Sequence, residues 1–194
     1  MNDFSIVCRL LGSLFARQPQ DPLLDPLFTL LQNNQLQQYW PLEQDALLAR
    51  LQAAAGDRGA LAQDYQGLFA AEGAVATQRS AYLADAEEQQ VRDFLLQRGM
   101  PLGAGAADSF GQLLLAASWQ EDQGQRDEVL AQASLFDVYL MPWAAQFLGK
   151  VEAHARTPFY RTLAELTREA LQALRDDLAE DEEGTADDED GDAA

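Results

Sequence analysis

Asp108-Ser-Phe-Gly-Gln-Leu-Leu-Leu-Ala-Ala-Ser-Trp119 is the stretch of sequence that decides the fold. From Phe110 to Trp119 it carries no charge, and its apolar side chains spread around most of a helix circumference. A surface helix keeps a polar stripe, so this pattern indicates a helix packed inside a bundle. About a dozen residues are too few to cross a bilayer. We therefore predict the central helix of an all-α domain, capped by Asp108, with Asp108 and Ser109 at its exposed mouth.

Helical periodicity recurs on both sides of this stretch. Asn2 or Asp3 is suited to cap a first helix, and Thr157-Pro158 is a start signal for a last one. Pro142 cannot continue a helix without losing a hydrogen bond, which predicts a kink or a restart there. Residues 73–84 have no helical period and are expected to form a loop, and no alternating strand pattern is present. The further apolar helix faces occupy residues 2–16, 27–31, 47–51, 58–69, 91–95, 127–140 and 143–151.

The acids are unevenly distributed along the chain. There are 32 acids and 13 bases, a net charge of −19, and residues 176–194 hold 11 of those acids and no base. We predict one helical domain over residues 1–179 and a disordered acidic tail over residues 180–194, because the tail has nothing to bury. An acidic body repels phosphate backbones, which argues against a nucleic-acid partner or a helical transcription factor. The same charge attracts basic peptides.

Cys8 is the only cysteine, so neither an intramolecular disulfide nor a CxxC site can form. It lies on an apolar helix face and is expected to be a small buried hydrophobe. The N-terminus lacks the basic region and cleavage site of a secretory signal. No apolar run has transmembrane length, so no stable membrane insertion is expected. These features favour the cytoplasm.

Candidate catalytic groups are few. His154 is the only histidine, and no nucleophile elbow, phosphate-binding loop or dinucleotide fingerprint is present. The paired acids Glu87-Glu88 and Glu121-Asp122 leave open a metal-dependent hydrolase that uses carboxylates. Adjacent acids in so acidic a chain more often form a solvated face. The sequence therefore favours a protein that is not an enzyme, with no cofactor and no metal site.

Apart from these weak catalytic candidates, the sequence offers an apolar interior with polar groups at its edge. Such a constellation suits recognition of a peptide, whose apolar side chains pack between helices while carboxylates hold its arginines. The alternative, that the aromatic side chains are simply core, is favoured for Phe69, Phe110 and Phe147. The edge residues singled out are Tyr65, Arg79, Ser80, Asp108, Ser109 and Trp143.

Four short motifs occur in a recognisable order. They are Tyr65-Gln-Gly-Leu68-Phe69, Asp108-Ser109-Phe110-Gly111, Leu140-Met-Pro-Trp143 followed by Phe147, and Pro158-Phe-Tyr160 followed by Leu163. In this order and spacing the chain resembles the TorD/DmsD/NarJ family of redox-enzyme maturation chaperones, and most closely its YcdY-like branch. The resemblance implies an all-α bundle of the TorD/DmsD type without catalytic activity. It also implies that Tyr65, Leu68, Phe69, Ser80, Asp108 and Ser109 line the client site, with Trp143 supporting it.

The resemblance further implies a metalloenzyme client, or its leader peptide, whose folding or cofactor insertion the chain assists. Two positions depart from the family pattern, since Ser109 and Tyr139 stand where histidines are usual. These departures favour a divergent member whose client differs from a standard molybdoenzyme with a twin-arginine leader. Resemblance to the YcdY-like branch suggests a cytoplasmic metalloenzyme of the zinc-dependent PHP-type hydrolase kind as the client. The resemblance allows a monomer or a helix-swapped homodimer, with residues 99–107 as the hinge.

Overall fold

The computed structural model describes residues 2–123 and 128–190, without the side chains of Glu128 and residues 181–190. Within that part the chain is helical and has no strand, only one isolated bridge between Gln78 and Ser109. This confirms the predicted all-α class. The helices are α1 (Asp3–Ala16), α2 (Asp25–Gln32), α3 (Asp45–Ala53), α4 (Arg58–Phe69), α5 (Glu88–Gln97), α6 (Phe110–Gln123), α7 (Glu128–Ser134), α8 (Met141–His154) and α9 (Pro158–Asp190).

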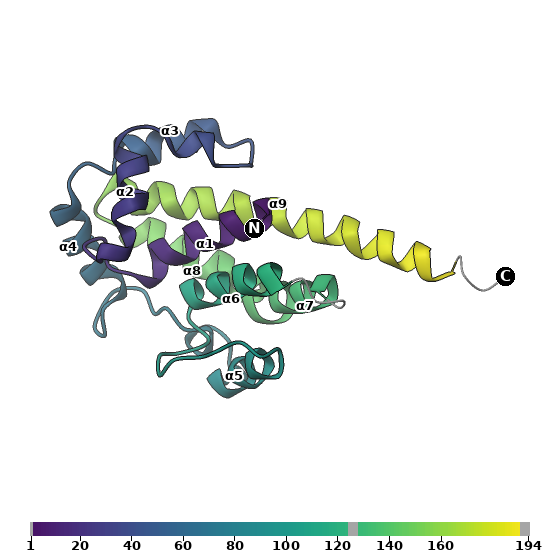
Figure 1. Ribbon diagram of the computed structural model, residues 1–194. Helices are drawn as coiled ribbons and strands as arrows, with labels where there is room; N and C mark the ends of the chain where they lie inside the picture. Colours follow the sequence, from purple (N-terminus) through teal and green to yellow (C-terminus); the bar gives the residue numbers. More distant parts are fainter. Residues whose placement is uncertain (1, 124–127, 191–194) are drawn as a thin grey trace.

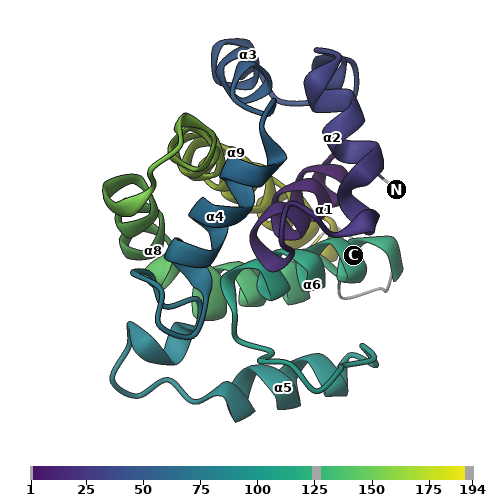
Figure 2. The ribbon, with the colours of Figure 1, turned by 90° about the vertical axis from the view of Figure 1, so that its left-hand side faces the viewer.

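The predicted central helix is α6, and α1 packs along it (Figures 1 and 2). Phe110, Leu113, Leu114 and Ala117 are fully buried, because α6 contacts neighbours on more than one side. The two helices approach closely at a pair of glycines. A Cβ atom added to Gly111 would lie 2.6 Å from the backbone nitrogen of Ala16, so this crossing has no room for a side chain.

Helix α9 packs against α8 and α3. It begins at the predicted Pro158, and its buried face runs from Phe159 to Leu178. Beyond Leu178 its last turns project away from the body (Figure 1). The backbone is helical to Asp190, and residues 191–194 lie outside the described part. A helical stretch of this length is marginal in water without packing. The domain boundary at residue 179 and the disorder of residues 180–194 stay predictions.

The restart expected at Pro142 takes the form of a π-helix, Leu135–Leu140, between α7 and α8. Pro142 then occupies the first turn of α8, where its missing N–H costs no helical hydrogen bond. Within the π-helix Leu140 is buried in the core, whereas Tyr139 is only partly buried and packs against the Phe94 ring of α5.

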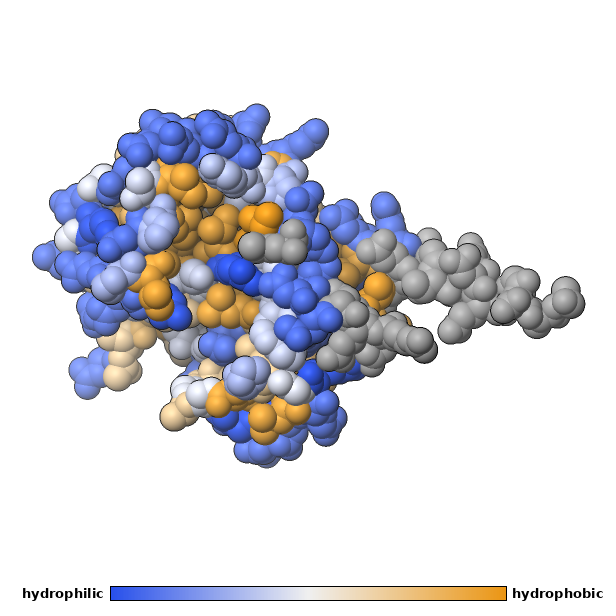
Figure 3. Space-filling model, in the orientation of Figure 1, coloured by the Kyte–Doolittle hydropathy of each residue, from blue (hydrophilic) through white to orange (hydrophobic). Residues whose placement is uncertain are grey.

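Helix α5 lies at the margin of the molecule, on the far side of α6 from α1 (Figure 2). Long connections join it to α4 and α6, and residues 73–84 form the predicted loop apart from one 3₁₀ turn, Arg79–Ala81. Leu96 of α5 is half exposed. Figure 3 shows apolar surface over this region and, on the same face, between α3 and α1.

Candidate functional site

Asp108 joins the loop before α6 to the Arg79–Ala81 turn. Its backbone oxygen accepts a hydrogen bond from the Arg79 N–H at 3.0 Å, and the Phe110 N–H donates to the Thr77 oxygen at 2.8 Å. One carboxylate oxygen, Oδ2, accepts from the Ser80 N–H at 3.1 Å. The other, Oδ1, is buried and has no hydrogen-bond partner in the described part of the chain.

Two expectations about Asp108 were wrong. Its carboxylate holds the Ser80 N–H, 28 residues away, rather than capping α6, whose first hydrogen bond runs from the Leu113 N–H to the Ser109 oxygen. The residue is also fully buried rather than at an exposed mouth, because the Arg79–Ala81 turn covers it. A buried carboxylate oxygen without a donor is costly, which marks this position as a candidate for binding a donor from outside.

Arg79 links α5 to the π-helix. Its Nη1 donates to the Gln90 side chain at 3.0 Å, and its guanidinium lies 5.2 Å from the centre of the Tyr139 ring. It is 8% exposed, and its Nε has no partner among the described residues. Arg79 therefore makes internal contacts in this conformation, and a role in client binding stays a prediction.

The aromatic side chains of the motifs form a continuous series of ring contacts, here called the aromatic row. It crosses from α4 through α8 and α6 to the loop before α5. Neighbouring centroids are 5.1, 6.1, 4.2, 5.6 and 5.1 Å apart, distances at which ring pairs attract beyond simple burial. In order, the row is Tyr65, Phe69, Phe147, Phe110, Trp143 and Tyr82.

Solvent access divides the predicted client-binding residues into two groups. Four are buried, namely Leu68, Arg79, Asp108 and Trp143. The other four are at least partly accessible, namely Tyr65, Phe69, Ser80 and Ser109. Leu68 and Trp143 cannot touch a client in this conformation because they are buried. They support the accessible rings from the core.

Tyr65 is anchored by its hydroxyl, which donates to the Phe15 backbone oxygen at 3.0 Å. Burial raises the pKa of this phenol above its usual value. Phe69 is only half buried, so the expectation that it is purely a core residue holds for Phe110 and Phe147 but not for Phe69. The accessible edges of Tyr65 and Phe69 offer apolar surface on a fixed base.

Sequence reasoning missed Tyr82. It closes the row against Trp143, and Lys150 Nζ lies 4.8 Å from its ring centre. Burial raises its pKa to about 12. The available signal was the single aromatic residue in the loop of residues 73–84.

The paired acids are engaged by the protein itself. Glu88 accepts from Arg92 and from the Ala107 N–H, while Asp122 accepts from Ser5 and Arg9. The described residues contain no group of three histidine, cysteine, aspartate or glutamate side chains able to hold a metal ion. His154 lies exposed in the last turn of α8. The carboxylates needed by the hydrolase alternative thus have structural partners.

Comparison with known proteins decides the family. The model of the family described as nitrate reductase delta subunit matches residues 33–149, which contain the first three motifs. The chain belongs to this family. Among its relatives, the Escherichia coli (strain K12) protein named Chaperone protein YcdY is 57% identical over 184 residues, covering 94% of this chain and all of that protein.

Two further relatives of the chain are more distant. An uncharacterized protein of Haemophilus influenzae is 44% identical over 93% of this chain and 97% of its own length. The Tat proofreading chaperone DmsD of Salmonella paratyphi A is 30% identical over 88% of each chain. The predicted family and YcdY-like branch are confirmed, and the chain is a molecular chaperone of the redox-enzyme maturation kind. The hydrolase alternative is not supported.

Among the described residues, no helix is both long and apolar enough to cross a membrane.

Proposed function

We propose that this chaperone holds a segment of a metalloenzyme client on the accessible edges of Tyr65 and Phe69, with a cationic group of the client reaching Asp108. The observation that carries the proposal is the buried Oδ1 of Asp108, two residues before Phe110 of the aromatic row, which has no hydrogen-bond partner among the described residues. A guanidinium or ammonium group supplies the donor that this oxygen lacks, and charge-assisted hydrogen bonds of this kind are strong.

Access to Asp108 requires movement of the Arg79–Ala81 turn. The turn is joined to the loop before α6 by the N–H groups of Arg79 and Ser80, which both donate to Asp108, and to α5 by the bond from Arg79 to Gln90. A client that takes over the carboxylate therefore displaces the turn, and the accessible Ser80 and Ser109 then lie beside it. In this proposal Leu68 and Trp143 keep the aromatic row in place, and Arg79 is released to contact the client.

The proposed client is a cytoplasmic metalloenzyme of the zinc-dependent PHP-type hydrolase kind, and the chain itself catalyses no reaction. A molybdoenzyme with a twin-arginine leader is the competing client. The chain acts in the cytoplasm as a monomer or as a helix-exchanged dimer, which light scattering of the purified chain distinguishes.

The test measures client binding by isothermal titration. Clients are co-purified from cells and identified, and the identified enzyme and a twin-arginine leader peptide are titrated separately. We expect Asp108→Asn and Tyr65→Ala each to weaken binding about tenfold, which corresponds to a loss of about 1.4 kcal/mol. Asp177→Asn, an exposed acid far along α9, is the matched control. Unchanged affinity for both site variants, with helical content retained, would rule out this surface.

A further inference from the structure

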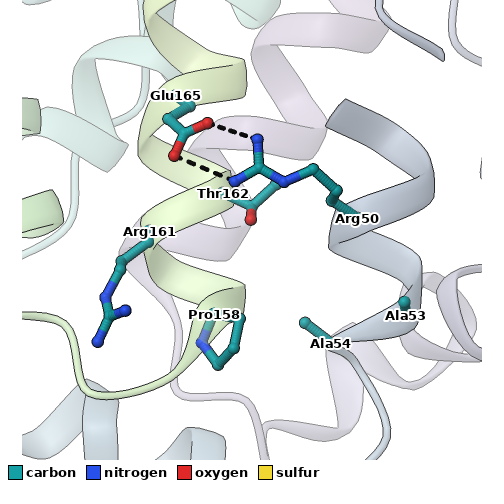
Figure 4. Close-up of a pocket in the computed structure, with 7 residues that line it drawn as sticks. All are labelled: Arg50, Ala53, Ala54, Pro158, Arg161, Thr162 and Glu165. Atoms are coloured by element: carbon teal, nitrogen blue, oxygen red, sulfur yellow. Dashed lines mark hydrogen bonds and ion pairs between the residues drawn. The ribbon is translucent and has the colours of Figure 1, made fainter. Parts of the chain in front are cut away.

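A cavity of about 540 Å³ lies between α3 and the first turns of α9, and it shares no residue with the proposed client site. Its volume falls within the range of small-ligand sites. Figure 4 shows the residues that line it, with α3 on one side and α9 on the other. They are Arg50, Ala53, Ala54, Pro158, Arg161, Thr162 and Glu165.

Two arginine side chains line this cavity, and they differ in their hydrogen-bond partners. Arg50 is held by Glu165 through two hydrogen bonds, at 2.7 and 3.2 Å, which fixes its plane. Arg161 donates its Nε to the Ala155 backbone oxygen at 3.0 Å and forms no ion pair with any described residue. In Figure 4 its guanidinium points away from Glu165 and lies on the other side of Pro158 from Ala53 and Ala54. The cavity therefore carries one net positive charge.

The remaining wall is small and apolar. Ala53 and Ala54 present only methyl groups from α3, opposite the Pro158 ring of α9. Below Arg50 the lining on this side consists of these two alanines, and Thr162, drawn behind Arg50 in Figure 4, is buried. A ligand that fits has a compact apolar part against the alanines and an anionic part toward Arg161.

The charge arrangement selects the kind of anion. The whole chain has a net charge of −19, so a positive cavity is a local exception that draws anions to one place. Glu165 at the rim repels a second negative charge, which disfavours phosphate dianions. We propose that this cavity binds the carboxylate of a polypeptide, from a chain end or from an acidic side chain, with the attached apolar atoms packed on Ala53 and Ala54.

The test follows backbone amide shifts of the labelled full-length chain by nuclear magnetic resonance. The probes are N-acetyl-leucine, a chain-end carboxylate, and N-acetyl-glutamate amide, a side-chain carboxylate. N-acetyl-leucinamide is the uncharged match, and inorganic phosphate is the dianion. We expect saturable shifts at Ala53, Ala54 and Thr162 with at least one carboxylate, and the stronger of the two identifies the source.

Two variants separate charge from shape. Arg161→Gln is expected to weaken carboxylate binding about fivefold, whereas Arg168→Gln, on the same helix and outside the cavity, leaves it unchanged. Ala53→Leu fills the cavity and is expected to abolish binding, whereas Ala46→Leu, exposed on the same helix, does not. Equal shifts with N-acetyl-leucinamide or stronger binding of phosphate would overturn the proposal, as would absence of saturable shifts with either carboxylate.

Discussion

Asp64 shows how one side chain joins two parts of the fold. It lies in α4, 3% exposed, next to the Tyr65 motif, yet its carboxylate accepts from the start of α9. The Arg156 N–H donates at 3.0 Å, and Thr157 donates its N–H at 2.7 Å and its hydroxyl at 2.6 Å. A carboxylate at this place accepts from free N–H groups at a helix start. Its negative charge also interacts favourably with the positive end of the helix dipole.

Replacing Asp64 by alanine is expected to lower the free energy of unfolding by about 2–4 kcal/mol, because it removes a cap and leaves the part-buried N–H groups of Arg156 and Thr157 unpaired. Asp57→Ala is the comparison, since Asp57 caps α4 through one exposed bond to the Ala60 N–H, and about 1 kcal/mol is expected there. Urea unfolding followed by circular dichroism measures both. Equal losses for the two variants would show that the contact of Asp64 with the start of α9 stabilises the chain no more than the local cap of α4.

At the scale of elements, the crossing of α1 and α6 sets how the bundle closes. Gly12 and Gly111 face each other across it, and a Cβ atom on Gly12 would lie 2.9 Å from the Gly111 oxygen. The backbones therefore touch where side chains usually separate helices. This closeness brings Phe15 of α1 within 5.1 Å, centre to centre, of Phe110 in the aromatic row.

Gly111→Ala is expected to destabilise the chain by about 1–3 kcal/mol, because the new methyl group meets backbone atoms that cannot move aside. Gly67→Ala is the matched control in α4, where nothing lies within 4 Å of the added Cβ atom. There the loss of chain entropy in the unfolded state predicts a gain of about 0.5–1 kcal/mol. Thermal and urea unfolding should thus shift in opposite directions for the two alanines.

Hydrogen bonds from Glu88 and Arg92 of α5 hold the connection from α5 to α6. Glu88 accepts from the Ala107 N–H at 3.0 Å and pairs with Arg92, which donates to the Gly105 oxygen at 2.8 Å. The Ala107 N–H, followed by Arg92, holds the pKa of Glu88 below its ordinary value. These bonds fasten the part of the chain expected to act as the hinge for helix exchange.

A lowered folded-state pKa means that this fastening is fully present above the ordinary carboxyl value of 4.5 and is lost as pH falls through the lower folded value. We expect the hydrogen-exchange protection of the Ala107 amide to fall in that acidic range. Glu88→Gln, which cannot ionise, should show weak protection that does not vary with pH. If both chains had the same protection at neutral pH, Glu88 would not be the fastening group.

The whole molecule combines a packed body with an acidic helical extension. The last buried side chain of α9 is Leu178, and α9 continues as backbone helix to Asp190. Residues 180–194 contribute nine acids and no base. Such a segment supplies charge rather than packing, and net charge far from zero favours solubility.

Deleting residues 180–194 is therefore expected to change the free energy of unfolding by less than about 0.5 kcal/mol, as for a surface change. Solubility of the shortened chain should fall at low salt, where charge repulsion acts over longer distances. Urea unfolding and a precipitation assay measure the two effects. A loss above about 1 kcal/mol would place the segment inside the folded domain and contradict the boundary at residue 179.

Much of the fold follows from local patterns. The apolar run of α6, the cap at Asn2 and the restart at Pro142 depend on residues a few positions apart, where helix geometry fixes which side chains meet. The candidate site was predictable only in part. Its motif residues were found by resemblance, but their exposure was not, since Asp108 and Leu68 proved buried.

The sequence by itself determined the helices, their order and the acidic character of the chain end, because hydrophobic period, capping residues, proline and charge act locally. The tertiary structure decided which distant groups meet: Asp64 with the start of α9, Asp108 with the Ser80 N–H, and Tyr82 with Trp143. These contacts span from 28 to 93 residues of chain. No local pattern specifies them, because they arise only when packing brings whole helices together.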